Sequence, residues 1–283
     1  MIGTICVCGA GTMGSGIAQH FALHGRSVIL FDLEQRFIDR ARVWIEKDLD
    51  KGIEKGKIDP AEKEATLARI RFTTRHEDCI APLIIEAIIE KPEAKTSLFH
   101  SLSKWNKPDT IFASNTSSLS IEALAGQIPN PERVAGLHFF NPAPLMKLVE
   151  IVTTPYSDPA VILALQNLCT ETGKIPVVCK DSPGFIVNRV ARPFYIESLR
   201  MAEEGKADLA TIDQLLENAG FRMGPFRLMD LIGNDVNYAV SVSVYEQLGQ
   251  PERLKPSYLQ KEKVDKGEWG KKSGKGYYDW QKT

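Results

Sequence analysis

The sequence predicts an α/β domain built on a parallel, doubly wound sheet, followed by an all-α domain. Three observations lead to this prediction. Short apolar runs alternate with helix-like segments over the first two thirds of the chain, and a glycine-rich turn follows the first run. Strand-like runs then largely stop after residues 181–185. Such alternation is typical of a parallel sheet that is covered by helices on both faces.

Eight apolar runs have the length and composition of buried strands. In chain order they are TICVCG, SVILFD, IRFTT, LIIEAII, TIFASN, VAGLHFF, KLVEIVT and IPVVCK. Segments with helical spacing fall between several of them. We expect helices over Met13–His24, Gln35–Lys55, Ala94–Trp105, Ser120–Ala125 and Pro159–Thr172. The charged stretch at residues 46–71 is longer than an ordinary crossover, and we expect it to form a solvated helical arm that projects from the sheet.

The stretch KDSPGF, at residues 180–185, marks the expected domain boundary. Its Asp-Ser-Pro-Gly sequence breaks regular structure. Three segments with helical length and glycine at their expected ends follow it: FIVNRVARPFYIESLRMAEEG, DLATIDQLLENAG and PFRLMDLIGNDVNYAVSVSVYEQLG. Pro193 should kink the first of these helices or mark its early turn. We therefore expect an α/β domain over residues 1–182 and a helical domain over residues 183–283.

Composition and charge favour an ordinary soluble protein. The net charge of −1 gives no reason to expect a nucleic-acid partner or an anionic membrane surface. No apolar stretch reaches the roughly 18 residues that a membrane-spanning helix needs. Cys6, Cys8 and Cys179 fall in strand-like runs, and no pair among the five cysteines has the spacing of a zinc site. We therefore expect reduced core thiols, no metal centre and a cytoplasmic location.

The glycine-rich turn has the pattern of a dinucleotide-binding loop. Gly9, Gly11 and Gly14 form a Gly-x-Gly-x-x-Gly motif directly after a strand and at the start of a helix. The first glycine permits the tight turn, the second lets a pyrophosphate approach the backbone, and the third lets helix and strand pack closely. Thr12 and Met13 belong to the same loop, where the helix N-terminus presents N–H groups to the phosphates.

The second strand-like run supplies a carboxylate for the same site. Asp32 ends this run, eighteen residues after Gly14. This is close to the spacing at which a carboxylate accepts hydrogen bonds from the adenosine ribose. A helix cap is the alternative for Asp32 alone, but the full strand–glycine–helix context favours NAD. Repulsion of a 2′-phosphate favours NAD over NADP, a preference that Arg36 weakens slightly.

Two ionisable residues lie in apolar strand-like runs near the middle of the chain. His138 belongs to one run and Glu150 to the next, with an Asn141-Pro142 turn between them. Histidine ionises near neutral pH and can take the proton of an alcohol as hydride leaves for NAD⁺. A carboxylate on the other ring nitrogen would fix the tautomer and stabilise the imidazolium. Alternatively, the histidine is satisfied by a backbone carbonyl and the glutamate points to solvent.

Several motifs together resemble one enzyme family. They are GAGTMGSGIAQ, EAIIE, ASNTSSLSI, GLHFFNPAPLMKLVEIV, KDSPGFIVNR, GPFRLMDLIG and KGYYDW. The chain resembles the L-3-hydroxyacyl-CoA dehydrogenases, of the short bacterial 3-hydroxybutyryl-CoA dehydrogenase type. This resemblance implies a Rossmann-like doubly wound sheet domain followed by an all-α C-terminal dimerisation domain. It also implies NAD as cofactor, an acyl-CoA substrate and a homodimer.

The resemblance assigns catalytic roles to four residues. His138 matches the catalytic base and Glu150 its partner carboxylate. Ser117, in NTSSL, matches the serine that hydrogen-bonds the reacting oxygen. Asn188, in FIVNR, matches an asparagine that faces the same oxygen. As alternatives, Ser117 is a helix cap, a role to which Ser118 and Ser120 are at least as well suited, and Asn188 is a polar residue on an apolar helix.

The resemblance also implies further contacts with NAD. The matching positions are Glu90, Lys95, Asn115, Ser117 and Asn141. Glu90 and Lys95 correspond to positions near the nicotinamide half. The alternatives are a solvated helix face for Lys95 and a turn-forming role for Asn141 before proline. The chain departs from the family pattern at Lys91, where an asparagine is common.

Contacts with CoA are implied on the charged arm. Lys51 and Lys55 lie where the family contacts CoA, whose phosphates suit basic side chains. Charges of both signs surround them, so a solvated helix is the alternative. Asp48 stands near a position that carries serine in related chains.

The resulting functional prediction is an NAD-dependent oxidoreductase that interconverts an L-3-hydroxyacyl-CoA and a 3-oxoacyl-CoA, with a short acyl chain. Two rivals remain open. One is a dehydrogenase of a non-CoA hydroxy acid or sugar acid. The other is a non-catalytic NAD-binding protein.

Overall fold

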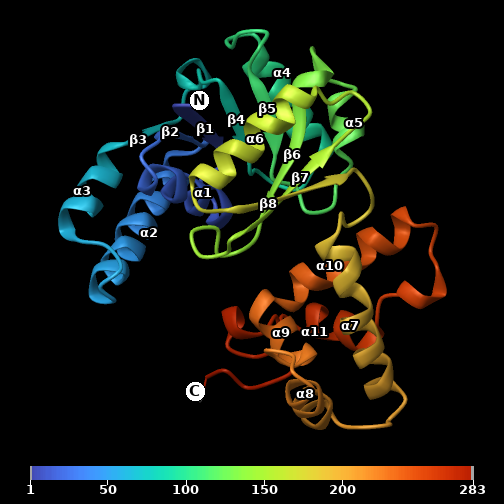
Figure 1. Cartoon of the computed structure of the whole chain (residues 1–283). Helices are drawn as coiled ribbons and strands as arrows, with labels where there is room; N and C mark the ends of the chain where they lie inside the picture. Colours follow the sequence, from blue (N-terminus) through green and yellow to red (C-terminus); the bar gives the residue numbers. More distant parts are fainter. Residues whose placement is uncertain (1, 282–283) are drawn as a thin grey trace. The chain divides into compact units, whose positions relative to one another are not determined.

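The computed structural model describes residues 2–281. These residues form two compact units that meet between Asp181 and Ser182. Figure 1 shows the first unit as a sheet with flanking helices and the second as a group of helices. No helix within the described residues has the length and apolar character needed to cross a membrane.

The first unit contains one eight-stranded sheet in the order β3-β2-β1-β4-β5-β6-β7-β8. The strands are β1 (Thr4–Cys8), β2 (Ser27–Phe31), β3 (Ile70–Thr73), β4 (Leu83–Glu86), β5 (Ile111–Ser114), β6 (Val134–Phe139), β7 (Leu148–Thr153) and β8 (Ile175–Lys180). All eight predicted strands are present, and β1 to β6 run parallel.

The sheet departs from the predicted parallel arrangement at one edge. Strand β7 runs antiparallel to β6, and β8 runs parallel to β7. Only a short proline-containing loop joins β6 to β7, whereas a parallel connection needs a crossover of a dozen or more residues. The loop length therefore imposes the reversal.

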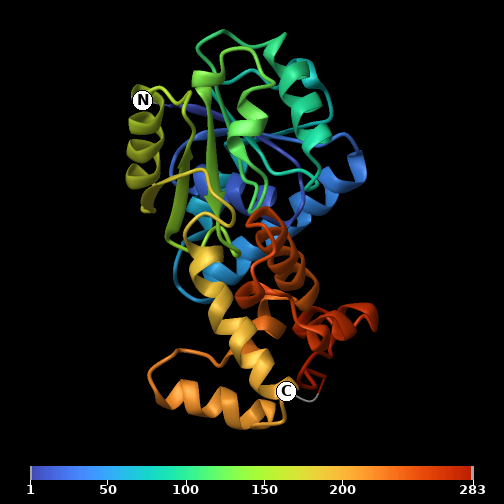
Figure 2. The ribbon, with the colours of Figure 1, turned by 90° about the vertical axis from the view of Figure 1, so that its right-hand side faces the viewer.

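The helices of the first unit lie on both faces of the sheet. They are α1 (Thr12–Leu23), α2 (Gln35–Glu54), α3 (Pro60–Ala68), α4 (Pro92–Ser103), α5 (Ile121–Ala125) and α6 (Pro159–Glu171), with short 3₁₀ turns η1 (His76–Asp78) and η2 (Pro131–Arg133). Apolar residues of α1, α2 and α6 form one continuous core with the strands. On the opposite face, Phe99 of α4 meets Phe112 of β5, with ring centroids 5.2 Å apart. Figure 2 shows α6 and α4 on the two sides of the sheet.

The charged arm consists of the end of α2 together with α3. Ile38, Ala41, Ile45 and Leu49 of α2 are buried at helical spacing, while most of its other side chains face solvent. Helix α3 begins with a capping box between Asp59 and Glu62. Both helices contact α1, and they project to one side in Figure 1.

The second unit is helical, as predicted. Its elements are α7 (Val187–Glu203), α8 (Leu209–Asn218), α9 (Pro225–Ile232), α10 (Asn234–Gln247), η3 (Glu252–Leu254), α11 (Tyr258–Asp265) and η4 (Lys271–Ser273). The last predicted helix is divided into α9 and α10 at Gly233, whose φ of 106° ends the first of them. Pro193 lies inside α7.

A buried carboxylate organises the end of the second unit. Asp230 accepts hydrogen bonds from Nδ2 of Asn234, the backbone N–H groups of Tyr277 and Tyr278, and Nε1 of Trp280. Its side chain is fully buried. Because a buried charge is costly unless it is well hydrogen-bonded, this set of donors fixes the C-terminal turn against α9.

His20 of α1 is an uncompensated polar group in the core. It is 2 % exposed, and neither ring nitrogen has a hydrogen-bond partner within residues 2–281. Burial lowers the pKa of His20 to about 2, and the positive charges of Lys174 and His24 act in the same direction. The imidazole is therefore neutral in the folded protein at neutral pH.

We predict that His20→Leu raises the free energy of unfolding at pH 7 by about 1–3 kcal/mol, because an unsatisfied buried polar group is removed. The unfolded histidine binds a proton below pH 6.5 and the folded one does not, so the wild type loses stability as the pH falls. The variant's advantage should grow by about 1.6 kcal/mol between pH 6.5 and pH 5. Urea unfolding of both proteins at pH 6.5 and at pH 5 measures this difference in the free energy of unfolding. The exposed His100→Gln serves as control, and equal pH slopes for wild type and His20→Leu would contradict the prediction.

Candidate active site

The glycine-rich loop joins β1 to α1 in a conformation that requires two of its glycines. Gly9 has φ of 105°, and a Cβ there would lie 2.5 Å from the carbonyl oxygen of Ala87. A Cβ on Gly14 would lie 1.7 Å from the carbonyl oxygen of Gly9. By contrast, a Cβ on Gly11 would meet nothing within 4 Å, so the loop is open at that point.

The start of α1 offers backbone donors at this opening. Gly11 is the N-cap, and no side chain of the described residues caps the helix there. Thr12 and Met13 form its first turn. N–H groups at a helix N-terminus favour phosphate, both by hydrogen bonding and through the helix dipole. The open loop and these donors fit a dinucleotide pyrophosphate.

Asp32 lies beside the loop at the end of β2. Its Oδ2 accepts from the backbone N–H of Ala10 at 2.8 Å, and its Oδ1 accepts from that of Glu34 at 3.3 Å. The N-cap of α2 is Glu34, so Asp32 is not that helix's cap. Arg36 pairs with Glu34 at 2.7 Å.

His138 and Glu150 are directly opposite each other on β6 and β7. Nδ1 of the imidazole lies 2.8 Å from Oε2 of the carboxylate. The two residues are 5 % and 1 % exposed. The alternative in which Glu150 points to solvent is therefore wrong. Phe140 packs against the imidazole, with ring centroids 4.5 Å apart.

The loop between β6 and β7 is fastened by a lysine that the sequence did not single out. Nζ of Lys174 donates to the carbonyl oxygens of Ala143 at 2.5 Å and Met146 at 2.7 Å. Burial lowers the pKa of Lys174 to about 8.

Asn141 lies at the exposed start of this loop. Asn115 accepts from the backbone N–H of Phe139 at 2.8 Å and so ties the end of β5 to that of β6.

Lys95 and Glu90 belong to a charged network at the carboxyl ends of β4 and β5. Nζ of Lys95 lies 2.6 Å from Oε1 of Glu86 and 3.0 Å from Oε2 of Glu90. Lys95 is 1 % exposed, so the alternative of a solvated helix face is wrong. Oγ of Ser114 donates to Oε2 of Glu86 at 2.6 Å. Glu86 and Ser114 were not named as site residues from the sequence. The glutamate in the apolar run LIIEAII could have indicated a buried, paired carboxylate.

The network reaches the serine-rich loop through Glu90. Its Oε1 accepts from the backbone N–H of Ser117 at 3.1 Å and from Oγ1 of Thr116 at 2.5 Å. Burial raises the pKa of Glu86 above its ordinary value despite the nearby lysine. For Glu90, burial acts in the same direction, but the charge of Lys95 and the hydrogen bond from Thr116 outweigh it and lower the pKa. The helix cap of α5 is Ser120, not Ser117.

The remaining predicted residues belong to helices α7 and α2. Asn188 is in the first turn of α7 in the second unit, where its backbone oxygen accepts from Nε of Arg192. Lys51 is an exposed residue of the last turn of α2, and Lys55 is its exposed C-cap. Asp48, one turn earlier, accepts from Gln19 of α1 at 2.9 Å.

Comparisons with known proteins cover both units. Residues 4–182 match the model of the 3-hydroxyacyl-CoA dehydrogenase NAD binding domain, and residues 184–280 match that of the 3-hydroxyacyl-CoA dehydrogenase C-terminal domain. The chain is 48 % identical over 280 residues to 3-hydroxyadipyl-CoA dehydrogenase of Escherichia coli, covering 98 % of this chain but only 59 % of that protein. It is 40 % identical to the pig mitochondrial hydroxyacyl-coenzyme A dehydrogenase, covering 98 % of this chain and 91 % of the relative.

A solved structure agrees over the whole fold. The (S)-3-hydroxybutyryl-CoA dehydrogenase of Ralstonia eutropha is 34 % identical, with a TM-score of 0.93 and 99 % of each chain covered. Both family domains thus occur in one chain, and the pig and Ralstonia eutropha relatives match it over 91 % and 99 % of their own length. The chain therefore belongs to the 3-hydroxyacyl-CoA dehydrogenase family, and its first domain is that family's NAD-binding domain.

Proposed function

We propose that the protein is an NAD-dependent dehydrogenase that interconverts an L-3-hydroxyacyl-CoA and the corresponding 3-oxoacyl-CoA, with a short acyl chain. The buried His138–Glu150 pair carries this proposal. An imidazole whose Nδ1 lies 2.8 Å from a carboxylate is built for proton exchange through its other nitrogen. Here that pair lies on two adjacent strands of an NAD-binding domain, where hydride and proton transfer can be combined.

Bound NAD supplies the hydride acceptor for oxidation and the donor for reduction. In the oxidising direction, Nε2 of His138 takes the proton of the 3-hydroxyl group as the C3 hydride leaves. Glu150 stabilises the imidazolium that results. In the reducing direction, the protonated imidazole gives its proton to the incipient alkoxide. General acid–base catalysis of this kind contributes roughly 10²–10⁴-fold in rate.

Two polar side chains are proposed to hold the reacting oxygen. Ser117 and Asn188 would donate hydrogen bonds to it, and so stabilise charge where it develops. The backbone N–H of Ser117 is fixed by Glu90 at 3.1 Å, which supports a defined position for this serine.

The proposed NAD site follows the carboxyl ends of the strands. The pyrophosphate would lie on the loop formed by Gly9, Gly11, Thr12, Met13 and Gly14. Asp32 would accept from the adenosine ribose and disfavour NADP. Glu90, Lys95, Asn115, Ser117 and Asn141 would line the nicotinamide half.

The substrate's CoA moiety is proposed to contact Lys51 and Lys55. Both side chains are exposed on the arm, which supports access. The relatives differ in the acyl group that their names give, 3-hydroxyadipyl for the Escherichia coli protein and 3-hydroxybutyryl for that of Ralstonia eutropha. The runner-up function is a dehydrogenase of a non-CoA hydroxy acid or sugar acid.

We further propose that the protein is a cytoplasmic homodimer, with domains at residues 1–182 and 183–283. All five cysteines are free thiols, which suits a reducing compartment. The helical unit exposes large apolar side chains, among them Ile186, Val190 and Phe221, which a partner subunit would cover.

We predict that the protein oxidises NADH rapidly with acetoacetyl-CoA, because the proposed site combines an NAD loop with a proton-exchanging histidine. NADPH should support little turnover, since Asp32 would repel its 2′-phosphate. The measurement is the loss of NADH absorbance, with free acetoacetate as the matched substrate control. Turnover of free acetoacetate at a comparable rate would favour the runner-up. No turnover of either substrate by protein that binds NADH would contradict the proposed short-chain substrate.

A second prediction concerns the buried network. Lys95→Met leaves the Glu86 carboxylate buried without its counter-charge, and should lower the free energy of unfolding by roughly 3–5 kcal/mol. It should also weaken NADH binding, because Glu90 loses an ionic partner. The double variant Glu86→Gln/Lys95→Met should recover part of the stability.

Urea unfolding and NADH fluorescence titration measure these two effects. Lys104→Met, at the exposed C-cap of the same helix, is the matched control. If Lys95→Met has the same free energy of unfolding and the same NADH affinity as the wild type, the role given to the network is contradicted.

A further inference from the structure

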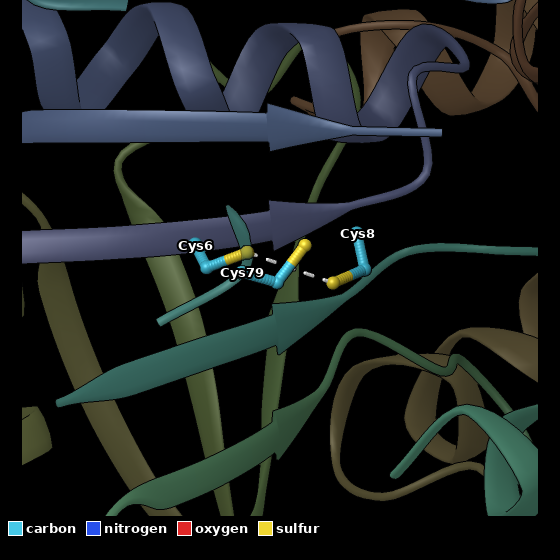
Figure 3. Close-up of side chains that lie close together, drawn as sticks. All are labelled: Cys6, Cys8 and Cys79. Atoms are coloured by element: carbon cyan, nitrogen blue, oxygen red, sulfur yellow. Dashed lines mark hydrogen bonds between the residues drawn. The ribbon is translucent and has the colours of Figure 1, made fainter. Parts of the chain in front are cut away.

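Three cysteine side chains converge on the face of the sheet opposite α1. Cys6 and Cys8 point to the same side of β1, as strand residues two apart must, and Cys79 follows η1 (Figure 3). The Sγ atoms of Cys6 and Cys8 are 3.8 Å apart. All three Sγ atoms lie within 4.8 Å of one another, and each of these cysteines is fully buried.

The positions of the three sulfurs are fixed by the surrounding fold. Strand β1 lies between β2 and β4, so Cys6 and Cys8 cannot shift without disturbing two parallel ladders. The thiol of Cys79 contacts the carbonyl oxygen of Arg75 at 3.6 Å. Ile80, which directly follows this cysteine, is exposed, and so is Arg75.

The thiolate, rather than the thiol, is the form of cysteine that binds metal ions.

We propose that Cys6, Cys8 and Cys79 form a binding site for a soft metal ion, monovalent copper, held by three sulfur atoms. Thiolate ligands select soft ions such as Cu(I). A metal–sulfur distance of about 2.3 Å places the sulfurs of one ion about 3.7–4.0 Å apart. The 3.8 Å between Cys6 and Cys8 fits this spacing, and Cys79 needs to move by less than an ångström or so.

The number of ligands distinguishes copper from zinc. No fourth histidine, cysteine or carboxylate in the part of the chain described by the structure joins this group. Zinc in structural sites almost always takes four ligands, whereas three buried sulfurs suit a three-coordinate monovalent ion. The ion would lie beneath the start of the glycine loop, because Cys8 directly precedes Gly9. The proposal does not depend on the proposed dehydrogenase activity.

Competition for copper tests the proposal. The full-length reduced protein is titrated anaerobically into the Cu(I)–bicinchoninate complex, and the loss of that complex's visible absorbance is followed. We expect the wild type to remove one equivalent of copper per chain, and Cys8→Ser and Cys79→Ser to remove none. Cys169→Ser is the matched control, because Cys169 is also fully buried but lies outside the cluster, and it should behave as the wild type.

Circular dichroism and NADH titration check that each variant is folded. X-ray absorption of the copper-loaded wild type gives a second reading that needs no variant, and should show three sulfur ligands. The proposal is overturned if the wild type removes no copper, if folded Cys79→Ser still removes an equivalent, or if the absorption spectrum shows nitrogen or oxygen ligands. If the mass of the intact protein is lower by two hydrogens and no copper is bound, a disulfide has formed instead. This result would also overturn the proposal.

Discussion

The hydrogen bond between His138 and Glu150 is the constraint on which the rest of the site depends. Both residues are buried, and a buried ionisable group is costly unless it is paired. They meet because β7 reverses direction and places position 150 directly opposite position 138. A shift of one residue in this register would turn one of the two side chains to the other face of the sheet. Lys174 stabilises the loop that sets the register by donating hydrogen bonds to two carbonyl oxygens of that loop.

The parallel part of the sheet brings the proposed NAD-binding residues of the first unit to the carboxyl ends of its strands. In the order β3-β2-β1-β4-β5-β6, the connections change direction between β1 and β4. Ligands of open α/β sheets bind outside the carboxyl ends of the strands at such a point. The glycine loop follows β1 there, Glu86 ends β4, and Ser114 ends β5. The Glu86–Lys95–Glu90 network then extends from β4 to the backbone of Ser117.

Local sequence patterns predicted most of the fold and the centre of the candidate site. The eight strands follow from apolar runs, the glycine loop from its spacing, and His138 and Glu150 from their apolar surroundings. Contacts between distant segments were missed, because no local pattern reports them. Lys95 lies on a helix that mixes polar and apolar residues. Its side chain is nevertheless buried, because its ammonium group pairs with Glu86 at the end of β4. Likewise, the sequence indicates that Cys6 and Cys8 are core residues, but it does not indicate that they lie close to Cys79.

A double-mutant cycle on the proposed catalytic pair, His138 and Glu150, tests the central claim most directly. Glu150→Gln keeps the side-chain shape but removes the charge, and His138→Gln removes the base. If Glu150 acts through His138, each single variant lowers kcat, by roughly 10²–10⁴-fold for His138→Gln. The double variant is then no slower than His138→Gln, while NADH affinity stays near wild type. Independent, multiplying losses in the double variant, or a parallel loss of NADH binding, would contradict the account.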